Sequence, residues 1–100
     1  MVKHIILWNI DNKYSAEEKA EIKKNIKDGL EGLMGKIPGM SEICVNINGL
    51  ESSTADLMLD STFESAEALK NYSVHPLHVE VADNKVRPYT SMRSCLDFEI

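Results

Sequence analysis

The order in which strand-like and helix-like hydrophobic patterns follow one another limits the possible folds of this chain more than any other feature. Residues 2–10 are rich in Ile, Val, Leu and Trp, which is typical of a strand that is buried on both faces in its middle. Later segments show either alternation of apolar and polar residues or a helical period. These patterns predict strands over 2–10, 41–48, 55–63 and 90–100, and helices over 15–34, over 65–72 and from 76 to just before Pro88.

Residues at the ends of the helical segments support these bounds. Ser15 is followed three residues later by Glu18, which is the capping-box spacing, in which both side chains satisfy backbone N–H groups at a helix start. Gly35 ends the first helix, and Pro76 suits the first turn of the last one because its ring presets the backbone angle φ. The predicted buried stripe of the first helix consists of Ile22, Ile26, Leu30 and Leu33.

Strand–helix–strand–strand–helix–strand is the order of the split βαβ, or ferredoxin-like, fold. We therefore expect one α+β domain over residues 1–100, with a βαββαβ order and a four-stranded antiparallel sheet that carries its helices on one face. The other face of such a sheet needs cover or must be polar.

The last predicted strand alternates between an apolar and a polar set of side chains. The apolar set, which we expect beneath the helices, consists of Met92, Leu96, Phe98 and Ile100. We expect the polar set on the uncovered face, where it would be solvated or would line a polar dimer interface. The polar set consists of Arg93, Cys95, Asp97 and Glu99.

Charge and cysteine content argue against several classes of function. The net charge of −5 argues against sequence-independent binding of nucleic acid, which depends on Lys and Arg neutralising phosphates. Cys44 and Cys95 are distant in sequence and indicate no disulfide framework, so we expect free, at least partly buried thiols. The longest apolar run, 5–8, is too short for a membrane span, and the chain opens directly in a strand. We therefore expect a cytoplasmic protein that does not act at a membrane.

The segment NYSVHPLHVE, residues 71–80, contains two of the three histidines and has several interpretations. His75 precedes Pro76, so a ring nitrogen of His75 can cap or orient the following helical segment. His78 can be a hydrogen-bonded histidine that fixes the helix against the first strand, or it can face a pocket. A zinc site needs three or four ligands, and no cysteine or third histidine lies nearby, so we expect no metal.

Several stretches of the chain resemble the stress-responsive dimeric α/β-barrel (Dabb) family. They occur in the family's order and cover nearly the whole chain, and H-P-x-H with F-E-S upstream is the most specific of them. The resemblance implies a ferredoxin-like subunit that pairs with a second copy of itself. The two sheets then close into a barrel, which covers the open sheet face. The matching stretches are VKHIILWN, IPGM, DLMLDSTFESAEALKNY, HPLHVEV and DFE.

The family includes olivetolic acid cyclase, a plant polyketide cyclase that closes an aromatic ring by intramolecular aldol condensation. Its catalytic pair is the tyrosine before the motif and the second histidine of H-P-x-H, which match Tyr72 and His78 here. His4 matches a further histidine near the same pocket. An aldol cyclisation needs a base with a pKa near the working pH and a donor to the developing oxyanion, and histidine and tyrosine suit these roles. The reaction requires no cofactor.

Trp8 and His75 complete the set of residues that we place at the expected ligand pocket with His4. Each of the candidate residues also has a structural interpretation. Trp8 and Tyr72 can be core aromatics, and His4 can be a strand residue that lies under the helices.

Two functions follow from these observations. The first is a homodimer that binds a small hydrophobic or carbonyl ligand, such as a polyketide, and performs cofactor-free acid–base chemistry. It predicts a cavity of roughly 300 Å³ or more that holds His78 and Tyr72 together. The second is a non-catalytic, stress-associated dimer with structural histidines, which predicts a filled core and a His78 satisfied by backbone partners. A cofactor-independent oxygenase is a third class, by fold analogy alone.

Overall fold

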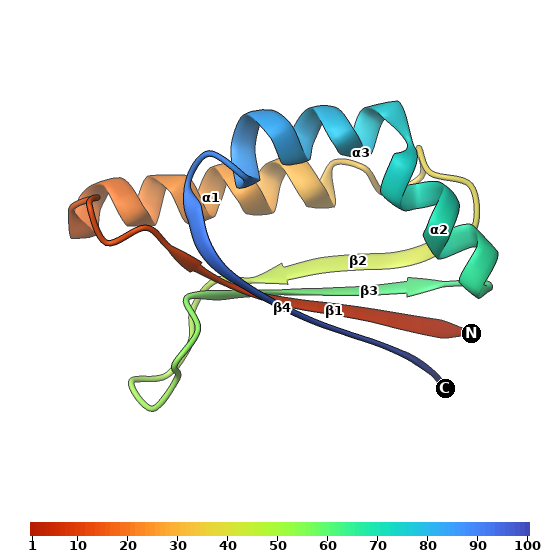
Figure 1. The fold of residues 1–100 in the computed structure, drawn as a ribbon, viewed down its shortest axis with the longest axis horizontal. Helices are drawn as coiled ribbons and strands as arrows, with labels where there is room; N and C mark the ends of the chain where they lie inside the picture. The colour runs from red at the N-terminus through yellow and green to blue at the C-terminus, as the bar shows by residue number, and fades with distance from the viewer.

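The chain forms a four-stranded antiparallel sheet that carries all of its helices on one side (Figure 1). The computed structural model describes residues 1–100. The strands lie in the order β2-β3-β1-β4, so the prediction of a ferredoxin-like fold is confirmed. The elements are β1 (Val2–Ile10), α1 (Ala16–Glu31), β2 (Met40–Asn46), β3 (Leu57–Phe63), α2 (Ala66–Val74), α3 (Pro76–Val81), the π-helical segment η1 (Ala82–Val86) and β4 (Thr90–Glu99).

The first helix begins as the sequence predicts and ends earlier. The Ser15 hydroxyl accepts from the Glu18 backbone N–H at 3.1 Å, and the Glu18 carboxylate accepts from the Ser15 backbone N–H at 3.0 Å, which completes the capping box. Helix α1 ends at Glu31, and a turn follows in which Leu33 remains buried. The buried stripe Ile22, Ile26, Leu30 and Leu33 is present.

The turn between α1 and β2 packs directly against α2. Gly35 and Gly39 have φ angles of +83° and +80°, which residues with a Cβ rarely adopt. A Cβ on Gly39 would lie 2.6 Å from the Cβ of Ala68, whereas a Cβ on Gly35 would have no neighbour within 4 Å. Gly39 therefore allows a close approach that no other residue type permits.

Strand register decides which side chains face the helices. In β1, Val2, His4, Ile6, Trp8 and Ile10 are buried, and the residues between them are less buried. Directly paired residues on neighbouring antiparallel strands share a face of the sheet. The partners of Ile6 and Trp8 on β3 are Leu59 and Leu57, which are both buried, so the core forms between this face and the helices.

The structure overturns the expected orientation of β4. Cys95 pairs with Ile6, Asp97 with His4 and Arg93 with Trp8, so the polar set of β4 faces the helix layer. The physical reason is the position of β4 at the edge of the sheet, where the strand lies at the border of the helix layer and its residues stay largely exposed. Polar groups on this face can therefore reach water or the β1 histidine.

The apolar set of β4 lies on the open face of the sheet. Leu96 and Phe98 are 64% and 41% exposed, and Leu7 on the adjacent strand is 39% exposed. Met92 and Ile100 continue the same surface. This face is therefore largely apolar along β4 and the middle of β1, and not polar as the sequence led us to expect. At one end of the face Lys3 forms ion pairs with Asp60 and Glu42. An uncovered apolar sheet face of this kind is typical of an interaction surface.

Cys44 and Cys95 are free but exposed, so the expectation of partly buried thiols is wrong. Cys44 lies on the open face of β2 and Cys95 on β4, and both strands are at an edge of the sheet. None of the helices combines the length and apolar character that a membrane span requires.

Candidate functional site

A cavity of about 180 Å³ lies between the helix-facing side of the sheet and the helices α2, α3 and η1. It brings together four of the residues predicted from the sequence: His4 and Trp8 from β1, Tyr72 from α2 and His78 from α3. Its remaining lining residues are Ile6, Leu30, Leu59, Ser73, Ala82, Val86, Arg87, Thr90 and Arg93.

A break between two helices places Tyr72 beside His78. Helix α2 ends at Val74, His75 adopts an extended backbone, and Pro76 begins α3. Pro76 disfavours a helical conformation of the residue before it, so the chain turns at His75. As a result the rings of Tyr72 and His78 lie with centroids 4.1 Å apart and planes inclined by 36°.

The hydroxyl group of Tyr72 is buried and has no hydrogen-bond partner in the protein. Tyr72 is 1% exposed, and burial raises the pKa of its phenol, so the group stays protonated and can donate. A buried polar group without a partner is rare and costly in folded proteins. An unpaired donor in a residue that lines a cavity points to a ligand oxygen as its missing partner.

One nitrogen of His78 is occupied, and the other has no partner in the protein. Nδ1 lies 3.3 Å from the backbone carbonyl of Ser73, a bond that requires the proton on Nδ1. Burial lowers the pKa of His78, and the nearby guanidinium groups of Arg87 and Arg93 lower it further. The ring is therefore neutral at pH 7, and its Nε2 can accept a proton. A purely structural role predicts that backbone groups satisfy both ring nitrogens of His78. In the structure a backbone group satisfies only Nδ1.

His4 approaches the same pair from the sheet. It is 7% exposed, and its ring centroid lies 6.1 Å from that of Tyr72. The Nδ1 atom of His4 lies 2.5 Å from Oδ1 of Asp97, a short charge-assisted hydrogen bond. This hydrogen bond orients the His4 ring. It can form only because the polar side chains of β4 face the helices, which the sequence did not predict.

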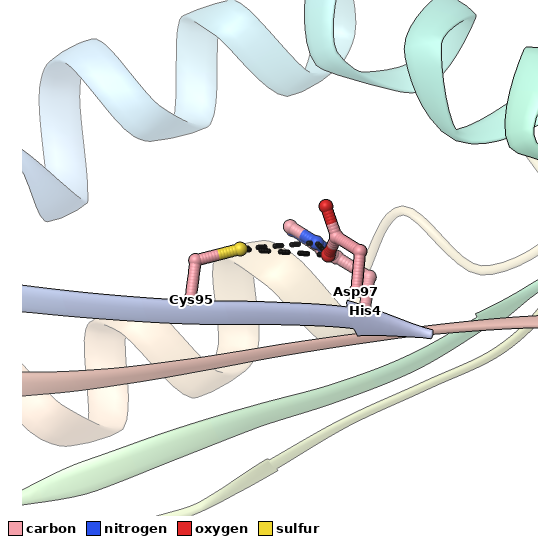
Figure 2. A group of neighbouring side chains, drawn as sticks. All are labelled: His4, Cys95 and Asp97. Atoms are coloured by element: carbon pink, nitrogen blue, oxygen red, sulfur yellow. Dashed lines mark hydrogen bonds and ion pairs between the residues drawn. The ribbon is translucent and has the colours of Figure 1, made fainter. Parts of the chain in front are cut away.

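Cys95 adds a third side chain to the pair of His4 and Asp97, as Figure 2 shows. Its Sγ lies 3.8 Å from Nδ1 of His4 and 3.4 Å from Oδ1 of Asp97. Two ligands of one zinc ion lie about 3.4 Å apart when the metal–ligand bonds are about 2.1 Å long. The 2.5 Å between Nδ1 and Oδ1 is therefore the spacing of a hydrogen bond and not that of two metal ligands.

His75 does not line the cavity, unlike the other predicted site residues. Its Nδ1 accepts a hydrogen bond of 3.1 Å from the backbone N–H of Leu77, so His75 caps α3 through its ring. The structure therefore places His75 in the structural role that was one of its two interpretations.

Arg87 and Arg93 line the cavity and were not identified from the sequence. The signal that was available is their rarity, since they are the only two arginines in the chain. Arg87 follows η1, and Arg93 lies on the helix-facing side of β4. Locating Arg93 required the pairing of β4 with β1, which the alternation of β4 by itself does not determine.

A larger hollow of about 390 Å³ lies between α1 and the end of η1. It is more open to solvent than the first cavity, and it contains no buried polar group without a partner. The chemistry of the smaller cavity therefore identifies it as the candidate site.

The fold and this cavity define a ferredoxin-like α+β protein whose candidate site lies between the sheet and the helices α2, α3 and η1. The sequence model of the family described as the stress responsive A/B barrel domain (Dabb) matches residues 2–100. The chain belongs to this family, which confirms the resemblance found in the sequence.

Solved structures agree with this assignment. A dimeric protein of unknown function with a ferredoxin-like fold from Bacteroides fragilis has a TM-score of 0.91 and 30% identity, over 99% of this chain and 95% of that one. The Arabidopsis thaliana protein At3g17210 has a TM-score of 0.74 and 26% identity, over 100% and 95%. A hydroxynitrile lyase from Passiflora edulis, with a TM-score of 0.73 and 19% identity over 99% and 92%, shows the fold alone. A search among curated proteins finds no match.

Proposed function

We propose that this chain works as a cytoplasmic homodimer that binds a small carbonyl compound in the cavity of each subunit and performs cofactor-free acid–base chemistry on it. In this proposal His78 is the catalytic base, Tyr72 is the catalytic hydrogen-bond donor, and His4 and Trp8 line the pocket. The observation that carries the proposal is the unpaired, buried hydroxyl of Tyr72 beside the neutral ring of His78.

The reaction follows from the state of each group. Nε2 of His78 takes a proton from the carbon next to a carbonyl, and the electron pair of the broken C–H bond moves onto the carbonyl oxygen. The Tyr72 hydroxyl donates to this developing enolate oxygen. In an aldol step the enolate carbon then forms a bond to a second carbonyl carbon of the same molecule, and His78 returns its proton to the new alkoxide.

The size of the cavity limits the substrate. Its volume of about 180 Å³ is smaller than the roughly 300 Å³ that we expected for a ligand site. A molecule built on a single ring matches this volume better than a long polyketide chain does. We therefore favour a compact carbonyl substrate over a tetraketide-like one.

The homodimer is supported by the apolar open face and by the relatives. No helix covers the second face of the sheet (Figure 1). Leu7, Leu96 and Phe98 present an apolar surface on this face. The relative from Bacteroides fragilis is described as dimeric. Pairing of two such faces buries both and forms the barrel that the family name describes.

Deuterium exchange tests the proposed chemistry without knowledge of the natural substrate. Phenylacetone, a one-ring ketone with acidic carbon-bound protons, is incubated with the protein in D₂O, and loss of the proton signal is followed by NMR. We expect the wild type to accelerate exchange, and His78→Ala and Tyr72→Phe to lose about 100-fold or more of this acceleration.

His75→Asn is the matched control for this assay because asparagine also caps helices and His75 lies outside the cavity. It should exchange the ketone as fast as the wild type. Equal exchange by the wild type and by His78→Ala would contradict the proposal.

The second candidate is the non-catalytic, stress-associated dimer with structural histidines. The role of His75 as a helix cap and the modest cavity volume favour it. This candidate predicts that neither the wild type nor any variant accelerates deuterium exchange of the ketone.

A further inference from the structure

Both arginines of this acidic protein lie at the candidate cavity. The chain carries a net charge of −5 and only two arginines, Arg87 and Arg93, which both line this one cavity. No Asp or Glu is among the lining residues. Arginine presents a planar fork of donors that matches a carboxylate or a phosphate.

The two arginines differ in their partners. Arg87 forms an ion pair with Asp83, four residues earlier on η1. Arg93 forms no ion pair with any carboxylate of the chain. The nearest carboxylate on the same face of β4, that of Asp97, is hydrogen-bonded to His4. Arg93 therefore has free donors at the edge of the cavity.

The lining residues also differ in depth. Tyr72 and Trp8 are 1% and 5% exposed, whereas Arg87 and Arg93 are exposed. The cavity thus has an inner end with an aromatic wall and an unpaired hydroxyl, and a rim with two guanidinium groups. A ligand that satisfies both ends carries an oxygen at its inner end and an anion at its outer end.

We propose that the cavity binds an anionic compound, an aromatic or short-chain carboxylate, with its carboxylate at the rim against Arg93 and with Arg87 as a second cation. The inference rests on the proposed function, since it uses the same cavity, and it specifies the class of substrate. In this arrangement the carboxylate is held at the rim while the reacting carbonyl lies at Tyr72 and His78.

A pair of probes with the same shape and different charge tests this inference by binding alone. Benzoate and benzamide are titrated into the ¹⁵N-labelled protein at neutral pH, and the indole N–H signal of Trp8 is followed by NMR. Trp8 is the only tryptophan in the chain and lines the cavity, so the indole region contains one signal that reports on the site. Ligands of this size bind with dissociation constants on the order of 1 mM.

We expect benzoate to shift the Trp8 signal at lower concentration than benzamide does, and added salt to weaken only benzoate. Arg93→Gln should weaken benzoate by roughly five-fold, the scale expected for one exposed charge pair, and leave benzamide unchanged. Arg87→Gln should have a smaller effect because Asp83 already neutralises Arg87. Lys36→Gln is the control, since Lys36 is exposed, forms no ion pair and lies outside the cavity.

Equal affinity for the two probes, with no effect of Arg93→Gln, would overturn the inference while leaving the proposed acid–base function intact. Failure of both probes to shift Trp8 at tens of millimolar would also overturn it. If the protein binds benzoate selectively but does not accelerate exchange of the ketone, the result would instead refute only the proposed catalysis. The spectra of Arg93→Gln away from the cavity show whether the variant is folded, and Arg93 is exposed, so we expect it to fold.

Discussion

The ring of Tyr72 lies with its centroid 4.1 Å from that of His78, although the two residues belong to different helices separated by the extended residue His75. The pair combines a buried, unpaired donor with a neutral base. Neither feature favours stability, since an unpaired buried hydroxyl and a desolvated imidazole both cost free energy. Such costs are typical of functional sites and can be measured.

Tyr72→Phe should leave the free energy of unfolding unchanged or raise it by up to about 1 kcal/mol, because the variant removes a buried hydroxyl that has no partner in the protein. Urea unfolding at matched protein concentration measures this, since the stability of a dimer depends on concentration. Tyr14→Phe, at a half-buried tyrosine outside the cavity, is the control. A loss of more than about 1 kcal/mol in Tyr72→Phe would show that the hydroxyl has a stabilising partner.

The stability of the protein should depend on pH through His78. Burial lowers the pKa of His78 in the folded state below its usual value of 6.5, so the unfolded chain binds the proton more readily. Stability is therefore greatest above pH 6.5 and falls as the pH drops from 6.5 toward the folded pKa. The fall should be less steep in His78→Gln. Urea unfolding of both proteins between about pH 7.5 and 5 measures the difference. Parallel pH profiles for the two proteins would refute this prediction.

Gly39→Ala should destabilise the protein by about 3 kcal/mol, because alanine at φ +80° is strained and its Cβ would lie 2.6 Å from the Cβ of Ala68. Gly35→Ala is a matched control with nearly the same φ, +83°, and open space around the new Cβ. It should cost about 1 kcal/mol from backbone strain alone. Thermal or urea unfolding compares the two. Equal losses would mean that α2 moves to accommodate the added methyl group.

Leu96→Lys should dissociate the proposed homodimer, because Leu96 is 64% exposed in one subunit and lies on the apolar open face of the sheet. Sedimentation or light scattering measures the mass of the particle in solution. Leu50→Lys makes the same change at a loop residue that is 79% exposed, and it should remain dimeric. A Leu96→Lys protein that keeps the mass of a dimer would place the interface elsewhere.

Several features could be predicted from the sequence because their causes are local. The capping box at Ser15 and Glu18, the buried stripe of α1 and the start of α3 at Pro76 each depend on residues within a few positions of one another. The strand bounds were predicted to within two residues: β2 ends at Asn46 and not at 48, and β3 begins at Leu57 and not at 55.

The orientation of β4 was predicted wrongly because alternation separates the two sets of side chains but does not say which set faces the helices. On a central strand the apolar set faces the core. On the edge strand β4 the polar set can face the helix layer, because that layer ends there, while the apolar set faces the surface that a second subunit would cover.

The sequence by itself determined the order of the elements, the starts of the helices and the proximity of Tyr72 and His78 along the chain, since these follow from hydrophobic period, capping and proline chemistry over short distances. The tertiary structure decided which residues meet across the sheet. The pairing of β1 with β4 joins Asp97 to His4, positions 93 residues apart, and brings Arg93 to the cavity. Such contacts depend on strand register, which is set by packing between distant segments, and no short stretch of sequence encodes it.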